Sequence, residues 1–163
     1  MIKEIETRRS IRKYVDKEIS KETLVDLLKA AMHAPTARNK QEWRYISSNN
    51  RNVLNELGAT PYYPMLKEAG AFIIVMADKS ITDEGFCYVD AGAATQNILL
   101  EAKSMNIGTC WCAIAPLEER INVIKNYFEL PDNILPIALI SIGYPNEEKG
   151  IDDRFDENKI TWY

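Results

Sequence analysis

Seven consecutive apolar residues, AFIIVMA at positions 71–77, form the stretch that decides the fold. Isoleucine and valine at its centre favour a β-strand. Because no polar residue interrupts the run, the strand is expected to be buried on both faces. The remainder of the chain must then supply the elements that cover those faces.

Helical and extended segments alternate on either side of this strand. Ser20 is a good N-cap, and the apolar residues from Leu24 to Met32 recur at helical spacing until Pro35 ends the helix. Further helices are expected over 50–57, where Gly58 closes the helix, and over 83–104. Another is expected to have Pro116 in its first turn. Further strands are expected over 43–47, 109–114 and 135–142. This interleaving predicts an α/β or α+β sandwich with helices against one sheet.

The composition is that of one globular domain spanning residues 1–163. Apolar residues make up 46% of the chain and charged residues 27%. The chain is too short for a two-domain Rossmann dehydrogenase or for a TIM barrel, which needs about 250 residues. A net charge of −4 argues against a nucleic-acid partner. No apolar stretch could span a bilayer, so no membrane partner is expected.

The three cysteines and the single histidine limit which disulfide, metal and nucleophilic sites the chain could form. The three cysteines at Cys87, Cys110 and Cys112 do not make a disulfide framework, and no signal peptide opens the chain, so a cytoplasmic protein is expected. The single histidine, His33, lies near the end of a predicted helix, where a structural role is expected. A His-rich zinc site is therefore excluded and a Ser-His-Asp nucleophile is disfavoured, so no metal site is predicted.

The densest functional signal is a basic segment near the N-terminus, Arg8-Arg9-Ser10-Ile11-Arg12, followed by Lys13. Guanidinium groups match phosphate oxygens in pairs, and a serine hydroxyl can donate one more hydrogen bond. The segment predicts an anion site. A solvated basic turn is the alternative.

Two further segments carry polar or reactive groups. The loop at 34–43 offers Asn39 and Gln41, whose amides suit a heterocycle with mixed hydrogen-bonding edges, although they could merely turn the chain. Cys110 and Cys112 share a face of a predicted strand, at or beyond the usual disulfide distance, so buried thiols are favoured over a thiol switch.

Taken in order, these segments resemble the FMN-dependent nitroreductase family, of which this chain would be a short member. The motifs are Arg-Arg-Ser-Ile-Arg at 8–12, the segment at 34–43, Gln-Asn-Ile-Leu-Leu at 96–100, Gly-Thr-Cys-Trp at 108–111 and Ile-Gly-Tyr-Pro at 142–145. The resemblance implies an α+β three-layer sandwich with a central, mostly antiparallel sheet. It further implies an intertwined homodimer with FMN at the subunit interface, NADH or NADPH as reductant, and a nitroaromatic, a quinone or a related small-molecule electron acceptor.

The resemblance also assigns residues. It places the FMN phosphate and ribityl chain on Arg8 and Ser10, with Arg9 nearby. Arg154 would be a further phosphate-binding arginine late in the chain. Arg12 would lie at the N1/C2-carbonyl edge of the flavin. The second subunit would contribute Thr36, Ala37 and Asn39, while Trp111, Ala113 and Ile114 would line the ring with a main-chain N–H near N5. No catalytic side chain is assigned, because the flavin carries the redox chemistry.

The chain also departs from the family pattern. Glu42 stands where proline usually precedes tryptophan, and acidic Asp90 takes a helix position that is often glutamine. A reductive dehalogenase, a flavin-fragmenting enzyme or an FMN-binding regulatory protein with little turnover stay open as alternatives. The polar tail ends in Ile160, Trp162 and Tyr163, which predicts that it docks, either on a partner subunit or on its own sheet.

Overall fold

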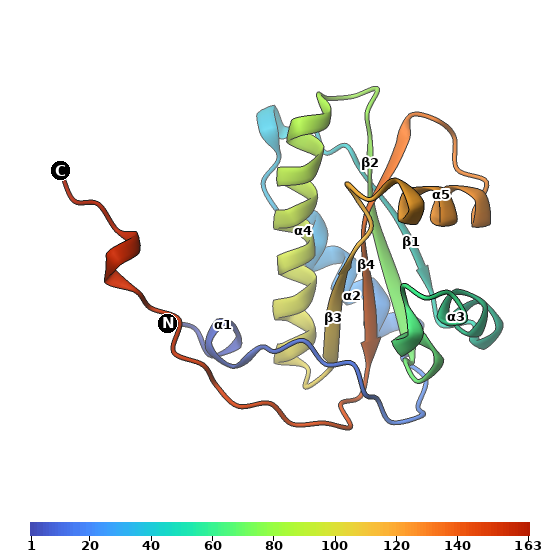
Figure 1. Cartoon of the computed structure of the whole chain (residues 1–163), viewed down its shortest axis with the longest axis horizontal. Helices are drawn as coiled ribbons and strands as arrows, with labels where there is room; N and C mark the ends of the chain where they lie inside the picture. Colours follow the sequence, from blue (N-terminus) through green and yellow to red (C-terminus); the bar gives the residue numbers. More distant parts are fainter.

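A computed structural model describes all residues, 1–163, and contains one antiparallel sheet of four strands (Figure 1). The strands are β1 (Trp43–Ser48), β2 (Ala71–Asp78), β3 (Gly108–Ala113) and β4 (Ile134–Gly143), in the order β1-β2-β4-β3. Every residue of β2 and β4 is buried. The prediction that the apolar run at 71–77 forms a doubly covered strand is confirmed.

Four α-helices flank the sheet: α2 (Lys21–Met32), α3 (Arg51–Gly58), α4 (Glu84–Ser104) and α5 (Glu118–Tyr127). A fifth, α1 (Lys3–Thr7), lies against α4 and buries none of its residues. In Figure 1, α4 and α2 lie on one side of the strands, and α5 and α3 lie on the other. On the α5 side, the ring centroids of Phe72 and Phe128 lie 6.4 Å apart. The three-layer α+β sandwich is therefore confirmed. No helix has both the length and the apolar character that crossing a membrane would require.

A β-bulge in the pairing of β2 with β4 fixes the position of the chain just after β3. The pairing of β2 with β4 shifts between Val75 and Met76, next to Pro136, which has no N–H to donate to the ladder. Ile137 is left out of that ladder, and its carbonyl accepts hydrogen bonds from Ile114 N (3.0 Å) and Ala115 N (3.2 Å). The bulge therefore ties the chain just beyond β3 to the core of the sheet.

The first long helix forms as its sequence predicts. The Ser20 hydroxyl accepts a hydrogen bond from Thr23 N at 3.2 Å, and His33 is the C-cap of α2, two residues before Pro35. The short helix α1 was not predicted, because it has five residues and buries none of them, so it leaves no periodic apolar pattern.

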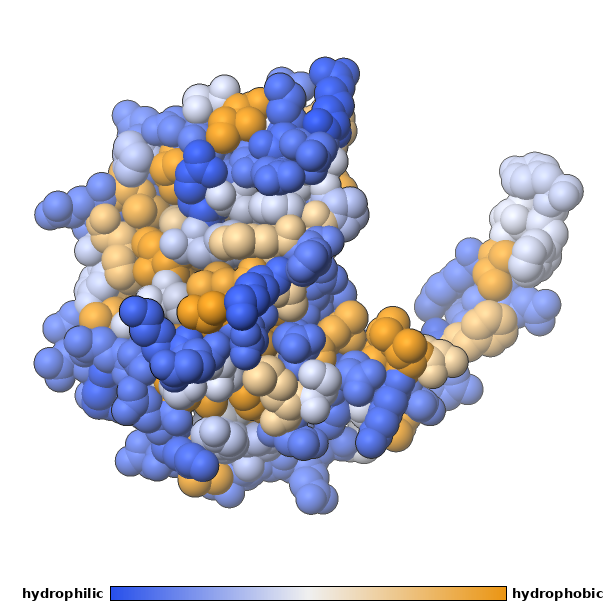
Figure 2. Space-filling view, turned by 180° about the vertical axis from the view of Figure 1, so that it is seen from behind, coloured by the Kyte–Doolittle hydropathy of each residue, from blue (hydrophilic) through white to orange (hydrophobic).

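Three predictions about element ends were wrong. Gly58 does not close α3 from outside but is its last residue, and Ala59 takes the C-cap without any glycine at positive φ. Pro116 precedes α5 by two residues, with Leu117 as N-cap, rather than lying in its first turn. Docking of the tail on its own sheet is also wrong, because Trp162 is 79% exposed and the tail stands clear of the body (Figure 2).

Candidate functional site

The basic segment forms an extended strap along the free edge of β3; we call residues 8–15 the N-terminal strap. Ser10 bridges Thr109 in parallel, and Ile11 N donates to Thr109 O at 2.9 Å. Side chains of an extended segment alternate in direction, so Arg8, Ser10 and Arg12 share one side. The predicted grouping of these three residues is therefore compatible with the backbone.

Tyr14 pins the strap to the sheet. Its hydroxyl donates to Ile11 O at 2.5 Å and lies 2.7 Å from the Ser141 Oγ. Burial raises the pKa of the Tyr14 phenol well above its ordinary value, so the group stays neutral and keeps these bonds. Gly143 leaves room for the ring, because a Cβ there would lie 2.7 Å from Tyr14 Cδ1.

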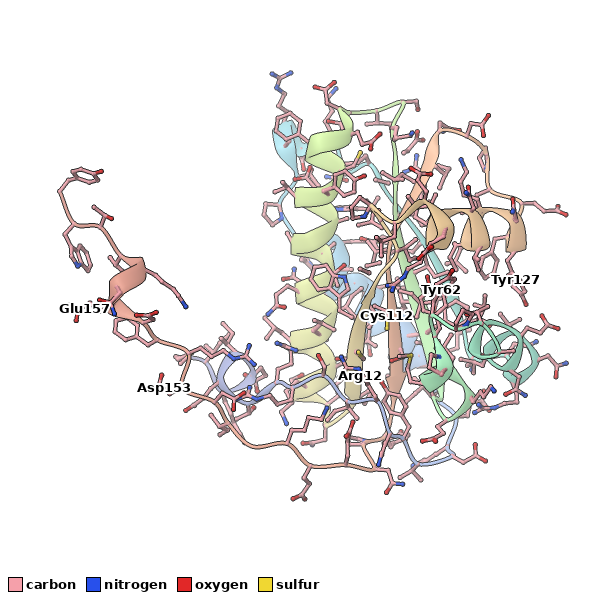
Figure 3. The ribbon with its side chains drawn as sticks, viewed as in Figure 1. Arg12, Tyr62, Cys112, Tyr127, Asp153 and Glu157 are labelled. Carbon is pink, nitrogen blue, oxygen red and sulfur yellow. The ribbon has the colours of Figure 1, made fainter.

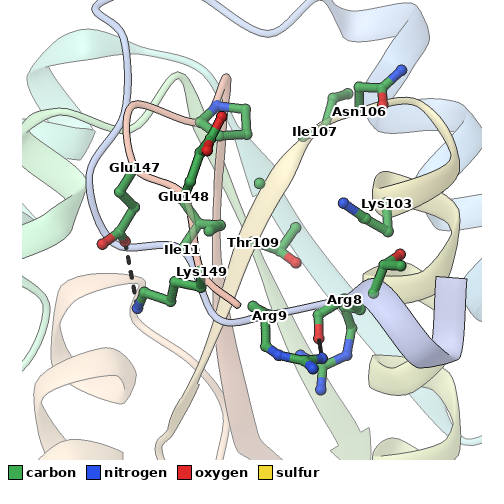
Figure 4. Close-up of a pocket in the computed structure, with 13 residues that line it drawn as sticks. Arg8, Arg9, Ile11, Lys103, Asn106, Ile107, Thr109, Glu147, Glu148 and Lys149 are labelled. Carbon is green, nitrogen blue, oxygen red and sulfur yellow. Dashed lines mark hydrogen bonds and ion pairs between the residues drawn. The ribbon is translucent and has the colours of Figure 1, made fainter. Parts of the chain in front are cut away.

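Two residues beyond β4 hold the strap from its other side, and sequence reasoning missed both. Glu147 accepts from the main-chain N–H groups of Arg12 (2.5 Å) and Lys13 (3.2 Å), which lowers the pKa of its carboxyl. Lys149 Nζ donates to Ser10 O at 2.7 Å and lies 3.6 Å from Glu147 (Figure 4). No local motif marks this pair, since its function depends on contact with a segment more than 130 residues earlier.

Three guanidinium groups crowd together beside the strap. Burial, followed by the charges of Arg154 and Arg9, lowers the pKa of Arg8. Arg9 is tied to main-chain carbonyls, including Gly150 O at 2.8 Å, but its Nη2 is buried without a hydrogen-bond partner. One carboxylate, Asp152, lies 3.9 Å from Arg9 and 3.5 Å from Arg154. The cluster therefore carries unneutralised positive charge.

Two cavities open beside this arginine cluster. One, of about 380 Å³, is lined by Arg8, Arg9, Lys103 and Lys149 together with Glu147 (Figure 4). The other, of about 690 Å³, lies between α1, α4 and the tail, where its lining includes Arg8, Arg9, Gln96 and Arg154. Neither lining includes Ser10, Arg12 or Trp111. Ser10 is half-buried, whereas Arg12 and Trp111 are exposed.

Strand β3 presents different groups on its two faces. Trp111 is 40% exposed and lies on the α4 side, 3.8 Å from where a Cβ on Gly92 would stand. Ala113 is exposed, but the side chain of Ile114 is fully buried, so only the main chain of Ile114 is available to a ligand.

The thiols of Cys110 and Cys112 lie on the face of β3 opposite Trp111, and neither forms a disulfide. Hydrogen bonding with Cys112, and then the charge of Arg12, lower the pKa of Cys110 to about 7. Cys112 Sγ lies 3.9 Å from the sulfur of Met65. Figure 3 shows Cys112 and Arg12 on neighbouring parts of the same face.

The residues at 36–39, here the Thr36–Asn39 turn, lie toward the end of α4 opposite α1 (Figure 1). Arg38 and Asn39 have positive φ values of 55° and 54°, which side chains other than glycine adopt at a cost in free energy. The turn is held by Thr36 Oγ1, which accepts from Gln41 N at 3.1 Å, and by Asp90 Oδ2, which accepts from Ala37 N at 2.9 Å. The structure does not bring this turn to the arginine cluster of the same chain.

The domain is a three-layer α+β sandwich with a cationic strap along one sheet edge, and guanidinium groups of such a strap can pair with anionic oxygens. Residues 5–61 and 47–144 match the nitroreductase family. The chain belongs to that family. A Methanothermobacter thermautotrophicus protein, provisionally named NADH dehydrogenase/NAD(P)H nitroreductase, is 40% identical over 98% of this chain and 85% of its own length.

Solved structures agree with this assignment. An FMN-dependent nitroreductase from Clostridium difficile is 31% identical and superposes with a TM-score of 0.91, covering 99% of this chain and 98% of that one. A protein from Desulfovibrio desulfuricans, described provisionally as a nitroreductase and solved in complex with FMN, is 27% identical with a TM-score of 0.86, covering 98% and 94%.

Proposed function

We propose that this protein is an FMN-dependent oxidoreductase that works as a homodimer. It takes reducing equivalents from NADH or NADPH and passes them to nitroaromatic, quinone or related small-molecule acceptors. The observation that carries the proposal is the arginine cluster beside the strap, which holds more positive charge than its own acidic residues neutralise. The provisional NAD(P)H nitroreductase name of one relative, and the FMN held by another, support the choice of cofactor.

The cluster suits the phosphate of FMN. Arg8, Arg9 and Arg154 repel one another in the free protein, and the buried Nη2 of Arg9 has no acceptor. A phosphate dianion would relieve that repulsion and accept from the forked N–H groups. Ser10 follows Arg8 on the same side of the strap, where its hydroxyl could donate to the ribityl chain. The fit therefore rests on groups that lack partners in the chain itself.

Arg12 lies further along the same side of the strap, and it is exposed. Its main-chain N–H is held by Glu147, while its guanidinium takes no ion pair within the chain. Bound FMN supplies the two-electron redox chemistry. The role of Arg12 would be to stabilise the negative charge that reduction places at the N1/C2-carbonyl edge, from a position fixed by the strap.

The dimer is inferred from surfaces that one chain leaves open. On α4, Phe86 is 46% exposed and Val89 is 68% exposed, one helical turn apart. The tail reaches away from the body with exposed aromatic side chains (Figure 2). A second copy would cover these apolar groups and bring its Thr36–Asn39 turn, with Ala37 and Asn39, to the flavin held by the strap. Trp111, Ala113 and the main chain of Ile114 would then line the ring.

The visible spectrum of the purified protein tests the proposal most directly. We expect bound FMN, or its uptake when FMN is added, together with a dimer in solution and bleaching of the flavin by NADH or NADPH. A colourless protein that takes up no added FMN would overturn the function. Bound FMN that neither nucleotide reduces would instead favour a binding or regulatory protein.

The class of acceptor is tested separately by steady-state assays with a nitroaromatic, a quinone and a halophenol. Turnover of the first two without release of halide supports the proposal. Release of halide would identify a reductive dehalogenase, and loss of the flavin spectrum that reoxidation does not restore would identify a flavin-fragmenting enzyme.

Replacing Arg12 with alanine is expected to lower the reduction potential of the bound flavin. The guanidinium would stabilise the reduced, more negative form more than the oxidised form, so its loss disfavours reduction. The potential is measured by anaerobic titration at full FMN occupancy. Lys13→Ala removes a neighbouring cation from the other side of the strap and should leave the potential unchanged. Equal potentials in wild type and Arg12→Ala would refute the role of Arg12.

A further inference from the structure

Glu42 is an unusual buried carboxyl group. It directly precedes β1, its side chain is fully buried, and neither carboxyl oxygen has a hydrogen-bond partner of normal geometry. Its main chain is fixed, because Glu42 O accepts from Asp78 N at 2.9 Å. An isolated ionised carboxylate is very unfavourable in such surroundings, so the group must be protonated or share a charge with a neighbour.

The neighbour is Asp90 on α4, which is also buried, with 5% of its surface exposed. Burial, a hydrogen bond with Asp90 and the charge of Asp90 all raise the pKa of Glu42. Two buried carboxyl groups that face each other repel strongly when both are ionised. The raised pKa means that Glu42 holds its proton to a higher pH than an exposed glutamate would.

Asp90 is also the residue that fastens the Thr36–Asn39 turn to α4. Its Oδ2 accepts from Ala37 N at 2.9 Å, and its main-chain carbonyl accepts from Trp43 Nε1 at 3.4 Å. These bonds hold both ends of a segment in which Arg38, Asn39 and Gln41 all have positive φ. A segment of that kind needs external bonds to keep its shape.

The other groups around the pair do not titrate near neutral pH. From α4, burial raises the pKa of Cys87 to about 11, and from β1, burial raises the pKa of Tyr45 further still. From β2, Asp78 is occupied by Arg44 at 3.2 Å. Within the turn segment, Arg38 and Lys40 are both exposed, and neither forms an ion pair with the carboxyl groups. Glu42, whose pKa is raised beside the Asp90 carboxyl, is thus the group on whose proton the turn can depend.

We propose that Glu42 and Asp90 hold a single proton between them, and that this proton keeps the Thr36–Asn39 turn in the shape that contacts FMN. With the proton present, Glu42 donates to Asp90, which remains an acceptor for Ala37 N. Without it, two buried carboxylates repel, and the turn is released from α4. The inference rests on the proposed function and adds to it a pH-dependent retention of the cofactor.

The variant that tests the proposal is Glu42→Gln, because glutamine places a permanent N–H donor where the proton would be. The FMN dissociation constant is measured by fluorescence titration from about pH 6 to about pH 9, where buried glutamates are known to titrate. For the wild type we expect the constant to rise about tenfold across this range, as one pKa unit of coupling between the pair and FMN requires. For Glu42→Gln we expect a rise of less than about twofold over the same range.

The control is Glu22→Gln, an exposed glutamate on α2, which should follow the wild type. Ionisation of FMN itself affects all three proteins equally and cancels in the comparison. Equal pH dependence in the wild type and Glu42→Gln, whether steep or flat, would overturn the inference while leaving the proposed function intact. A wild-type chain that binds no FMN at any pH would overturn the proposed function first, and the inference with it.

A second measurement does not depend on whether the variant folds. In wild-type protein labelled with ¹³C at glutamate carboxyl carbons, without FMN, one resonance should titrate with a pKa raised clearly above that of the exposed glutamates. If every glutamate resonance titrates near its ordinary pKa, no proton is retained and the inference fails.

The free energy of unfolding should depend on pH in the same direction as FMN binding does. The pKa of Glu42 is raised in the folded state, so stability from its proton is present at low pH and is lost as the pH rises through the ordinary value toward the folded value. As pH increases, the free energy of unfolding of Glu42→Gln should therefore rise relative to that of the wild type.

Discussion

Replacing Arg8 with alanine is expected to weaken FMN binding about 100-fold. A hydrogen bond to a charged group contributes roughly 1.5–3 kcal/mol, and a guanidinium that makes two such bonds to phosphate reaches about 3 kcal/mol. Every 1.4 kcal/mol corresponds to about a tenfold change in the dissociation constant. The constant is measured by fluorescence titration of the apoprotein with FMN.

The same variant should leave the stability of the apoprotein within about 0.5 kcal/mol of the wild type. In the free protein burial, and then the charges of Arg154 and Arg9, lower the pKa of Arg8, so its removal relieves repulsion rather than breaking an attraction. Arg51→Ala is the matched control, since Arg51 pairs with Asp16, one residue beyond the strap, and with Lys67 O, and it lines neither cavity beside the arginine cluster. Equal FMN affinity in wild type and Arg8→Ala would refute the phosphate assignment.

Replacing Gly143 with alanine is expected to lower the free energy of unfolding by about 1–3 kcal/mol, the range typical of an overpacked core. The added Cβ would lie 2.7 Å from Tyr14 Cδ1 and 2.9 Å from Tyr14 Cγ. The ring cannot move away freely, because its hydroxyl is bonded to Ile11 O and to Ser141. Denaturant unfolding of the apoprotein measures the change.

This substitution should also weaken FMN binding, because any shift of Tyr14 displaces the strap that carries Arg8 and Arg12. Gly85→Ala is the control: Gly85 lies in the first turn of α4 with nothing within 4 Å of the added methyl. Alanine is preferred there over glycine by up to about 1 kcal/mol, so this variant should be slightly stabilised. A Gly143→Ala protein as stable as the wild type would show that Tyr14 does not restrain the strap.

The parts of the fold that were predictable are those whose sequence pattern is continuous. The run at 71–77 and the residues at 135–142 are apolar throughout, and α2 has a capping serine, a periodic apolar face and a terminating proline. Helix ends were less predictable. Gly58 could remain inside α3 because the final carbonyls are satisfied by Ala59 N without a left-handed residue. Pro116 stayed outside α5 because Leu117 takes the N-cap position.

The site was predictable to the extent that its residues are neighbours in sequence. Arg8, Ser10 and Arg12 alternate along one segment, and the structure presents them on one side of an extended strap. The groups that hold the strap could not be found in this way. Glu147 and Lys149 reach it from beyond β4, and Glu42 meets Asp90 only because the fold brings the start of β1 to α4, where Trp43 Nε1 donates to Asp90 O. Such pairings depend on tertiary contacts that no local spacing encodes.

The position of the strap has a consequence for association between molecules. Strand β3 is at the edge of the sheet, and an uncovered edge is a template on which strands of other molecules can add. The strap occupies that edge through Ser10 and Ile11. The segment proposed to hold the cofactor thus also shields the sheet against aggregation, and any change that loosens it endangers both properties at once.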